Sequence, residues 1–234
     1  MDNFTLIIPI YNEEKNIFTL YEEIINSEAN KYISSIIFID DASIDDSLKV
    51  LNEISKKNQL VKIIKNKQNL GQSRSIYLGI LEASTKYVLT IDGDGQNDPK
   101  DISKLINFYL NHRSYSLISG IRNNRKDNFI KKITSKIANL IRKFYLNDNC
   151  IDTGCALKLF DKEVIISFPF FNGIHRFLPA IYKGLNKNCY FINVNHRYRK
   201  FGKSKYGTFL RLFFGIRDMI YVKKLIKNYK KKYV

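Results

Sequence analysis

Short apolar runs alternate with longer amphipathic segments in this 234-residue chain, and no other feature restricts its fold as much. The runs predict strands at residues 4–9, 35–40, 61–65, 86–92 and 116–120. The segments between them predict helices at residues 13–27, 45–57, 72–83 and 99–111. Strands and helices in this order predict an α/β fold, with a Rossmann-like, mostly parallel sheet flanked by helices.

The second half of the chain is more basic and less regular. We predict a basic helix at residues 129–146, a strand at 153–160, a helix at 175–184, a strand at 189–195 and a basic loop at 196–207. No internal repeat or low-complexity linker interrupts the chain, and its length suits a single core. We therefore predict one domain at residues 1–207, followed by a helix at 208–234.

The net charge restricts the class of partner. A formal charge of +17 suits nucleic acid, an anionic bilayer or phosphorylated substrates, although a coding bias toward Lys, Asn and Ile is an alternative cause of part of the excess. The helix at 208–234 carries an apolar stripe beside Lys and Arg residues that accumulate toward its end. It predicts either a helix lying on a membrane surface, a helix packed on the domain, or both. The predicted stripe is Phe209, Leu212, Phe213, Ile216, Ile220, Leu225 and Ile226.

Cysteine usage and hydropathy restrict the compartment. Cys150, Cys155 and Cys189 form no CxxC pair and are odd in number, which indicates a reducing compartment and neither a disulfide framework nor a zinc site. The apolar start of the chain is predicted to be a buried strand and not a signal peptide. No run approaches the ~18 uncharged apolar residues of a membrane span. We expect a cytoplasmic protein, peripheral at the inner face of the membrane.

An acidic turn, DGDGQ at residues 92–96, directly follows the fourth predicted strand. Asp92 and Asp94 are separated by a glycine, so their oxygens can converge on one point together with the amide of Gln96. Hard cations such as Mg²⁺ or Mn²⁺ prefer oxygen ligands and share their remaining positions with phosphates. The alternative is a solvated acidic turn, but polar groups also end the first and second strands, at residues 11–13 and 40–43. In a parallel sheet these ends lie at one edge, where ligands bind.

Basic residues near the acidic turn are candidates for holding phosphate oxygens. The loop at 199–205 is the strongest, because glycine and serine give its backbone the freedom to wrap an anion. Each single basic residue also has a solvated surface position as its alternative, and His175 and His196 could be structural or phosphate-facing. The basic set is Arg122, Arg125, Lys131, Lys132, Arg197, Arg199, Lys200, Lys203 and Lys205.

Together these motifs resemble family 2 glycosyltransferases of the GT-A fold, in the polyprenyl-phosphate branch that includes dolichol-phosphate mannose synthases. The resemblance covers nearly the whole chain, and its motifs occur in the family's order. They are IPIYNE at 8–13, DDASID at 40–45, NLG at 69–71, DGDGQ at 92–96, SGIR at 119–122, DTGC at 152–155 and RKFGKSK at 199–205. The resemblance implies an inverting transferase that moves a sugar from a nucleotide diphosphate (GDP-mannose or a UDP-sugar) to a polyprenyl phosphate.

The resemblance also implies roles for single residues. The donor would contact Pro9, Tyr11, Asn12, Glu13, Asp41, Asp92 and Gly93. The metal would bind Asp92, Asp94 and Gln96; Asp94, Arg122 and Arg199 would be catalytic; and Lys131, Ser135, Arg199 and Lys205 would face the acceptor phosphate. The chain departs from the pattern at Ala42, where the family has glycine, at Ile121 for serine and at Lys131 for arginine. We expect Ala42 to matter little, provided that its φ is negative.

Two other functions remain alternatives. A family 2 enzyme that glycosylates a saccharide hydroxyl would need a carboxylate base near the acceptor, for which Asp152 is the candidate. A phosphate acceptor is already anionic at neutral pH and needs no strong base. A nucleic-acid-binding protein would account for the charge, but the acidic strand ends would repel a phosphate backbone, so we expect no nucleic-acid partner.

Overall fold

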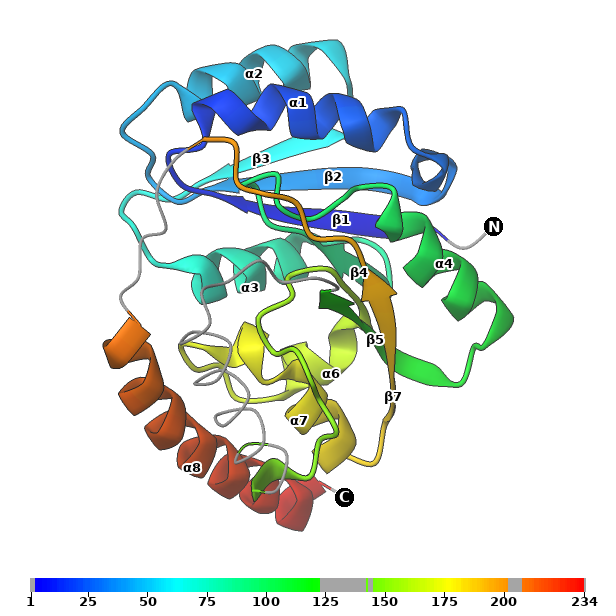
Figure 1. The fold of residues 1–234 in the computed structure, drawn as a ribbon, viewed down its shortest axis with the longest axis vertical. Helices are drawn as coiled ribbons and strands as arrows, with labels where there is room; N and C mark the ends of the chain where they lie inside the picture. The colour runs from blue at the N-terminus through cyan, green and yellow to red at the C-terminus, as the bar shows by residue number, and fades with distance from the viewer. Residues whose placement is uncertain (1–2, 123–141, 143–144, 202–207, 234) are drawn as a thin grey trace.

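The computed structural model describes residues 3–122, 142, 145–201 and 208–233, with no side-chain description for 208–216 and 233. Figure 1 shows a sheet with helices on both faces. The strands are β1 (Phe4–Ile10), β2 (Ile33–Asp40), β3 (Val61–Lys65), β4 (Tyr87–Thr90), β5 (Tyr115–Arg122), β6 (Lys158–Asp161) and β7 (Asn188–Val194). The helices are α1 (Glu14–Ile25), α2 (Ser47–Lys57), α3 (Gln72–Glu82), α4 (Asp101–Asn111), α6 (Lys162–Ser167), α7 (Leu178–Gly184) and α8 (Thr208–Tyr233), with 3₁₀ helices η1 (Glu28–Tyr32) and η2 (Ile174–Arg176).

The sheet has the order β3-β2-β1-β4-β6-β5-β7. All neighbouring strands are parallel except β6, which runs antiparallel to both β4 and β5. The predicted mostly parallel α/β sheet is confirmed. β6 starts at Lys158, later than the predicted strand at 153–160, and most of the predicted helix at 129–146 lies outside the described residues.

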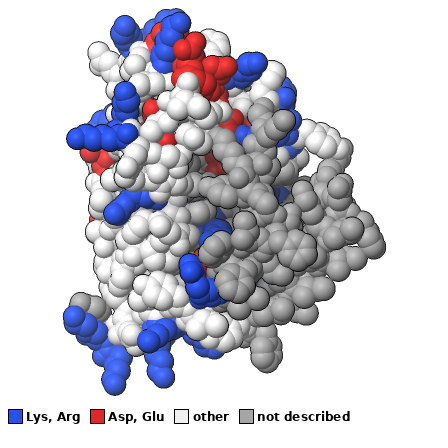
Figure 2. All heavy atoms as spheres, turned by 90° about the vertical axis from the view of Figure 1, so that its left-hand side faces the viewer, with Lys and Arg blue, Asp and Glu red and all other residues white. Residues whose placement is uncertain are grey.

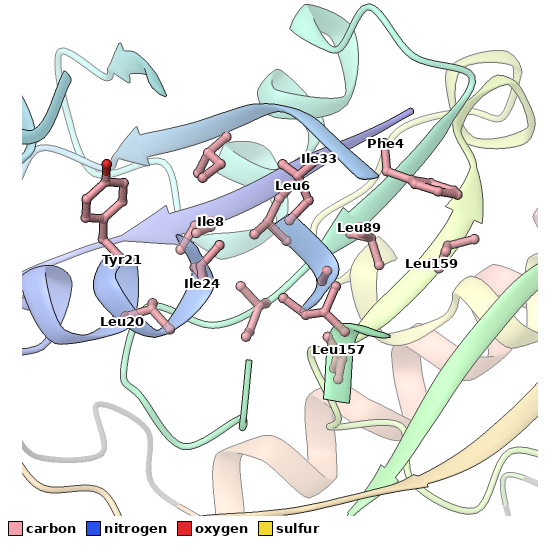
Figure 3. Close-up of a cluster of buried hydrophobic side chains, with 14 of the residues drawn as sticks. Phe4, Leu6, Ile8, Leu20, Tyr21, Ile24, Ile33, Leu89, Leu157 and Leu159 are labelled. Atoms are coloured by element: carbon pink, nitrogen blue, oxygen red, sulfur yellow. The ribbon is translucent and has the colours of Figure 1, made fainter. Parts of the chain in front are cut away.

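Alternating side chains of the central strands fill two separate cores. Phe4, Leu6 and Ile8 point to one face, where they pack with residues of α1 and α4 (Figure 3). Ile7 points to the other face and packs with α3 residues such as Ile80. Both faces are therefore buried, which explains why these strands are continuous apolar runs in the sequence.

The described part of α8 packs against the domain. Met219 and Val222 are buried in the same core as α7, and Ile226 lies so close to Gly184 that a Cβ atom there would be 2.6 Å from its Cγ2. Ile220, which we placed in the apolar stripe, is 55% exposed instead, because the packed face follows Met219 and Val222. Nowhere in the described chain does a helix combine the length and hydropathy of a membrane span.

Candidate functional site

The turns after β1, β2 and β4 lie side by side, because these three strands are neighbours in the sheet. Gly93 lets the acidic turn rest on the end of β1. A Cβ atom at Gly93 would lie 3.0 Å from the carbonyl oxygen of Pro9 and 2.3 Å from Cδ1 of Ile10. Any larger residue would push Asp92 and Asp94 away from the first strand.

Asn12 joins the first two turns. Its φ of 55° lies in the left-handed region that Asn tolerates. Its backbone N–H donates to Ser43 Oγ at 3.0 Å, and its Oδ1 accepts from the backbone N–H of Ile44 at 2.8 Å. Tyr11 and Pro9 are partly exposed beside it. Asn12, which we predicted to bind the donor, thus also fixes the geometry of the site.

Asp41 is buried, and both of its oxygens accept hydrogen bonds from the turn before α3. The N–H of Leu70 donates to Oδ1 and that of Gly71 to Oδ2, each at 2.8 Å. Gly71 has a φ of 83°, which glycine adopts without strain. Among the described residues, Asp40 Oδ2 is buried with no hydrogen-bond partner. Asp40, which we placed among the polar groups at the end of the second strand but did not assign to the donor, thus keeps one oxygen that no described protein group occupies.

Arg199 connects the basic loop to the acidic turn and to Glu13 at the end of β1. Its guanidinium pairs with Glu13, and its Nη1 lies 3.8 Å from Asp94 Oδ2. The loop is anchored through Gln96, whose carbonyl accepts from the N–H of Arg197 at 2.8 Å. Glu13, Asp94 and Arg199, separated by up to 186 positions, are thus brought into one cluster.

Asp92 is the inner carboxylate of the acidic turn. Gln72 Nε2 donates to its Oδ1 at 2.7 Å. Burial, followed by the charge of Asp94, raises the pKa of Asp92 to about 7, while Lys158, Arg122 and Arg199 oppose the shift. A buried carboxylate beside a second carboxylate suits a bound cation.

Arg122 and Asp152 form a bidentate ion pair. Arg122 Nε and Nη2 each donate to one oxygen of Asp152 at 2.7 Å, and the N–H of Gly154 donates to Oδ1 at 3.2 Å. A Cβ at Gly154 would lie 2.7 Å from Arg122 Nη2, so glycine makes room for the guanidinium. Asp152 is therefore held as an acceptor by several donors and is poorly placed to serve as a base.

Lys158 is a charged residue of the site that the sequence did not reveal. It is 3% exposed in β6, opposite Thr90 of β4, and its Nζ donates to the carbonyl of Cys155. Burial lowers its pKa, and its charge opposes the raised pKa of Asp92. A single Lys within an apolar run was the only available signal.

His175 has a structural position. Its Nδ1 lies 2.8 Å from Ser73 Oγ, which also accepts from the N–H of Gly173 at 2.7 Å. Burial lowers the pKa of His175 to about 3, so the ring is neutral at pH 7. Lys131, Ser135 and Lys205 lie outside the described residues, so their predicted roles stay predictions.

Ala42 has a φ of 58°, so the condition on which we expected it to be harmless is not met. We predict that Ala42→Gly raises the free energy of unfolding by about 0.5–1 kcal/mol, because relief of left-handed strain exceeds the added entropy of the unfolded chain. Urea denaturation measures this. The same change at Ala83, whose φ is −61°, should destabilise the protein. An equal effect at both positions would contradict the assignment of strain to Ala42.

Comparison with known proteins gives the same assignment as the site. The sequence model of the family described as "Glycosyl transferase family 2" matches residues 5–168, which is more than half of the chain. The chain belongs to glycosyl transferase family 2. The match includes the strand ends that carry Glu13, Asp41, Asp92 and Asp94.

Curated relatives of this family 2 chain act on polyprenyl phosphates by name. It is 32% identical over 223 residues to dodecaprenyl-phosphate galacturonate synthase of Rhizobium johnstonii, covering 93% of this chain and 65% of the relative. It is 29% identical over 215 residues to undecaprenyl-phosphate 4-deoxy-4-formamido-L-arabinose transferase of Pectobacterium carotovorum, covering 90% and 64%. The chain thus spans about two thirds of the length of these relatives.

Solved structures confirm the GT-A fold. Glucosyl-3-phosphoglycerate synthase from Mycobacterium tuberculosis, in complex with Mn²⁺, UDP and phosphoglyceric acid, superposes with a TM-score of 0.70 at 15% identity, covering 96% of this chain and 78% of that one. Mannosyl-3-phosphoglycerate synthase from Rubrobacter xylanophilus gives 0.70 at 11% identity, covering 97% and 75%. At these identities the likeness establishes the fold alone.

Proposed function

We propose that this family 2 glycosyltransferase moves a sugar from a nucleotide diphosphate to a polyprenyl phosphate, with inversion, at the cytosolic face of a membrane. The observation that carries the proposal is the cluster in which Arg199 lies between Glu13 and Asp94. The cluster places the guanidinium of Arg199 next to the carboxylates of Glu13 and Asp94. These lie at the edge of the sheet where ligands of such folds bind. The names of the curated relatives support the class of acceptor.

The residues of the acidic turn fit a divalent cation. Asp92 and Asp94 offer hard carboxylate oxygens, and burial beside Asp94 raises the pKa of Asp92 to about 7, a shift that a bound cation would oppose. Within the described residues, no group of three or more His, Cys, Asp or Glu could hold a metal by itself. A site of two carboxylates and an amide would leave positions for diphosphate oxygens. When bound, Mg²⁺ or Mn²⁺ would neutralise charge on the leaving diphosphate.

The other side chains of the site have separate proposed roles. Asp40, with its unpartnered buried oxygen, and Asp41 lie where a base or ribose of the donor would bind. Arg199 would stabilise the developing negative charge with a fixed guanidinium. Arg122 is already paired with Asp152. Its main contribution would therefore be its positive charge, and not a free pair of N–H donors.

An anionic phosphate acceptor fits this arrangement better than a hydroxyl. A hydroxyl acceptor needs a base, and Asp152 is engaged by Arg122 and by the N–H of Gly154. The test is to incubate the protein with labelled nucleotide sugars and short-chain polyprenyl phosphate, and to extract with butanol. Label in the butanol phase supports the proposal, whereas label on saccharides alone would favour the hydroxyl alternative.

The outer face of α8 supports contact with an anionic membrane. Ile220 and Tyr221 are exposed on it beside Lys224, Lys227 and Lys231. Figure 2 shows Lys and Arg side chains at the lower end of the molecule. This is the end at which α8 terminates in Figure 1. Each lysine near an anionic surface contributes about 1 kcal/mol.

We predict that the triple variant Lys224→Gln, Lys227→Gln, Lys231→Gln binds phosphatidylglycerol-containing vesicles about 100-fold more weakly, because about 3 kcal/mol of attraction is lost. Co-sedimentation with vesicles measures this. The control replaces the exposed Lys49, Lys56 and Lys57 of α2, which changes the net charge equally. Equal losses in both triples would indicate a general charge effect and contradict a docking face on α8.

A further inference from the structure

The first turn of α3 lies between two of the strand ends that form the site. The backbone N–H groups of Leu70 and Gly71 bind Asp41 at the end of β2, and the side chain of Gln72 reaches Asp92 after β4. Gln72 was not among the residues that the sequence singled out. Its Nε2 lies 2.7 Å from Asp92 Oδ1, a short hydrogen bond to a carboxylate.

The start of α3 is held firmly in place. Ser73 Oγ is bonded to the N–H of Gly173 and to His175 Nδ1, which ties the helix to η2. Farther along, Gly79 packs so closely on the sheet that a Cβ would lie 2.6 Å from Ile7 Cγ2. Because the helix is fixed at both points, Gln72 offers its amide from a rigid base.

The chemistry of a glutamine suits this position. An amide N–H fixes the orientation of Asp92 without neutralising its charge, whereas a Lys or Arg would compete with a bound cation. With Oδ1 held by Gln72, Oδ2 is the oxygen of Asp92 left for a ligand. Partners that orient a metal-binding carboxylate typically alter metal affinity or activity by about 10–100-fold when they are removed.

We propose that Gln72 is a positioning residue that orients Asp92 for the metal–diphosphate complex of the donor. The inference rests on the proposed function, since it assigns Asp92 to that complex. Gln72 acts through Asp92 and does not itself need to touch the donor.

The experiment measures the thermal shift that UDP or GDP produces as Mn²⁺ is titrated. Two variants remove the amide N–H that donates to Asp92. Gln72→Met keeps the length of the side chain, and Gln72→Ala shortens it. We expect the half-saturating Mn²⁺ concentration to rise about 10–100-fold in both, while the melting temperature without ligand changes little. Leu81→Gln, at a half-exposed position in the last turn of α3, is the control and should behave as wild type.

Each outcome decides a different point. Unchanged Mn²⁺ dependence in Gln72→Met and Gln72→Ala, with a normal response of the wild type, would overturn the role of Gln72 and leave the proposed function standing. A fall in the unliganded melting temperature with no change in Mn²⁺ dependence would mark Gln72 as merely structural and also overturn it. A wild type that shows no nucleotide shift that depends on Mn²⁺ would overturn both.

Discussion

Asp94→Ala is expected to lower the turnover number for sugar transfer by about 10³-fold. Asp94 is the outer carboxylate of the acidic turn, and its Oδ2 faces Arg199 at 3.8 Å. Its loss removes a ligand of the proposed cation and a fixed partner of Arg199, and stabilisation of the leaving diphosphate by a metal is worth several kcal/mol. Initial rates at saturating donor and acceptor measure the effect.

The matched control for Asp94→Ala is Glu53→Ala. Glu53 is an exposed carboxylate on α2 and carries the same charge, so its removal changes the net charge equally. Activity within a factor of two of wild type is expected for Glu53→Ala. If Asp94→Ala retained a tenth or more of the wild-type rate, the assignment of Asp94 to the catalytic centre would be wrong.

The largest effect on stability is expected from Asp148→Ala. Asp148 is fully buried and lies 2.7 Å from Nη2 of Arg142, which is itself 5% exposed. Removing the carboxylate leaves the guanidinium buried without its counter-charge, which costs about 3–5 kcal/mol and lowers the melting temperature by about 10 °C. Calorimetry and urea denaturation measure both quantities.

Replacing both partners of this ion pair should not lower the stability of the protein. Burial raises the pKa of Asp148 although Arg142 lowers it, so burying the carboxylate costs more than the ion pair returns. We expect Arg142→Met combined with Asp148→Leu to be near wild type or more stable. The exposed pair Lys62–Glu82 is the control, and Lys62→Ala should change stability by less than about 1 kcal/mol. A double variant as unstable as Asp148→Ala would contradict the ion-pair account.

The sequence predicted the parts of the structure that depend on local patterns. Short apolar runs between amphipathic segments located β1 to β5, and glycine-spaced carboxylates marked Asp92 and Asp94 as a turn. The parallel sheet predicted that the strand ends carrying Glu13 and Asp94 lie at one edge, because the carboxyl ends of parallel strands meet there. The ion pair of Arg199 with Glu13 was not predicted.

What the sequence did not predict depends on individual contacts between distant segments. Whether Asp40 or Asp41 keeps a free oxygen is decided by the N–H groups of Leu70 and Gly71, 29 and 30 positions away from Asp41. Likewise, the pairing of Arg122 with Asp152 turned a candidate base into an acceptor. No periodicity encodes such choices, since they arise when side chains compete for donors in the folded chain.

The place of β6 in the sheet has a consequence for the order of folding. Strands β1 to β4 pair with one another within residues 4–90, so this block can assemble while later residues are still being synthesised. Closing the remainder of the sheet requires Thr90 to meet Lys158, so it must wait until the chain beyond residue 158 has been made. Arg122 and Arg199 both follow Thr90 in the chain, so the nascent protein would complete its carboxylate turns well before the cations that oppose them.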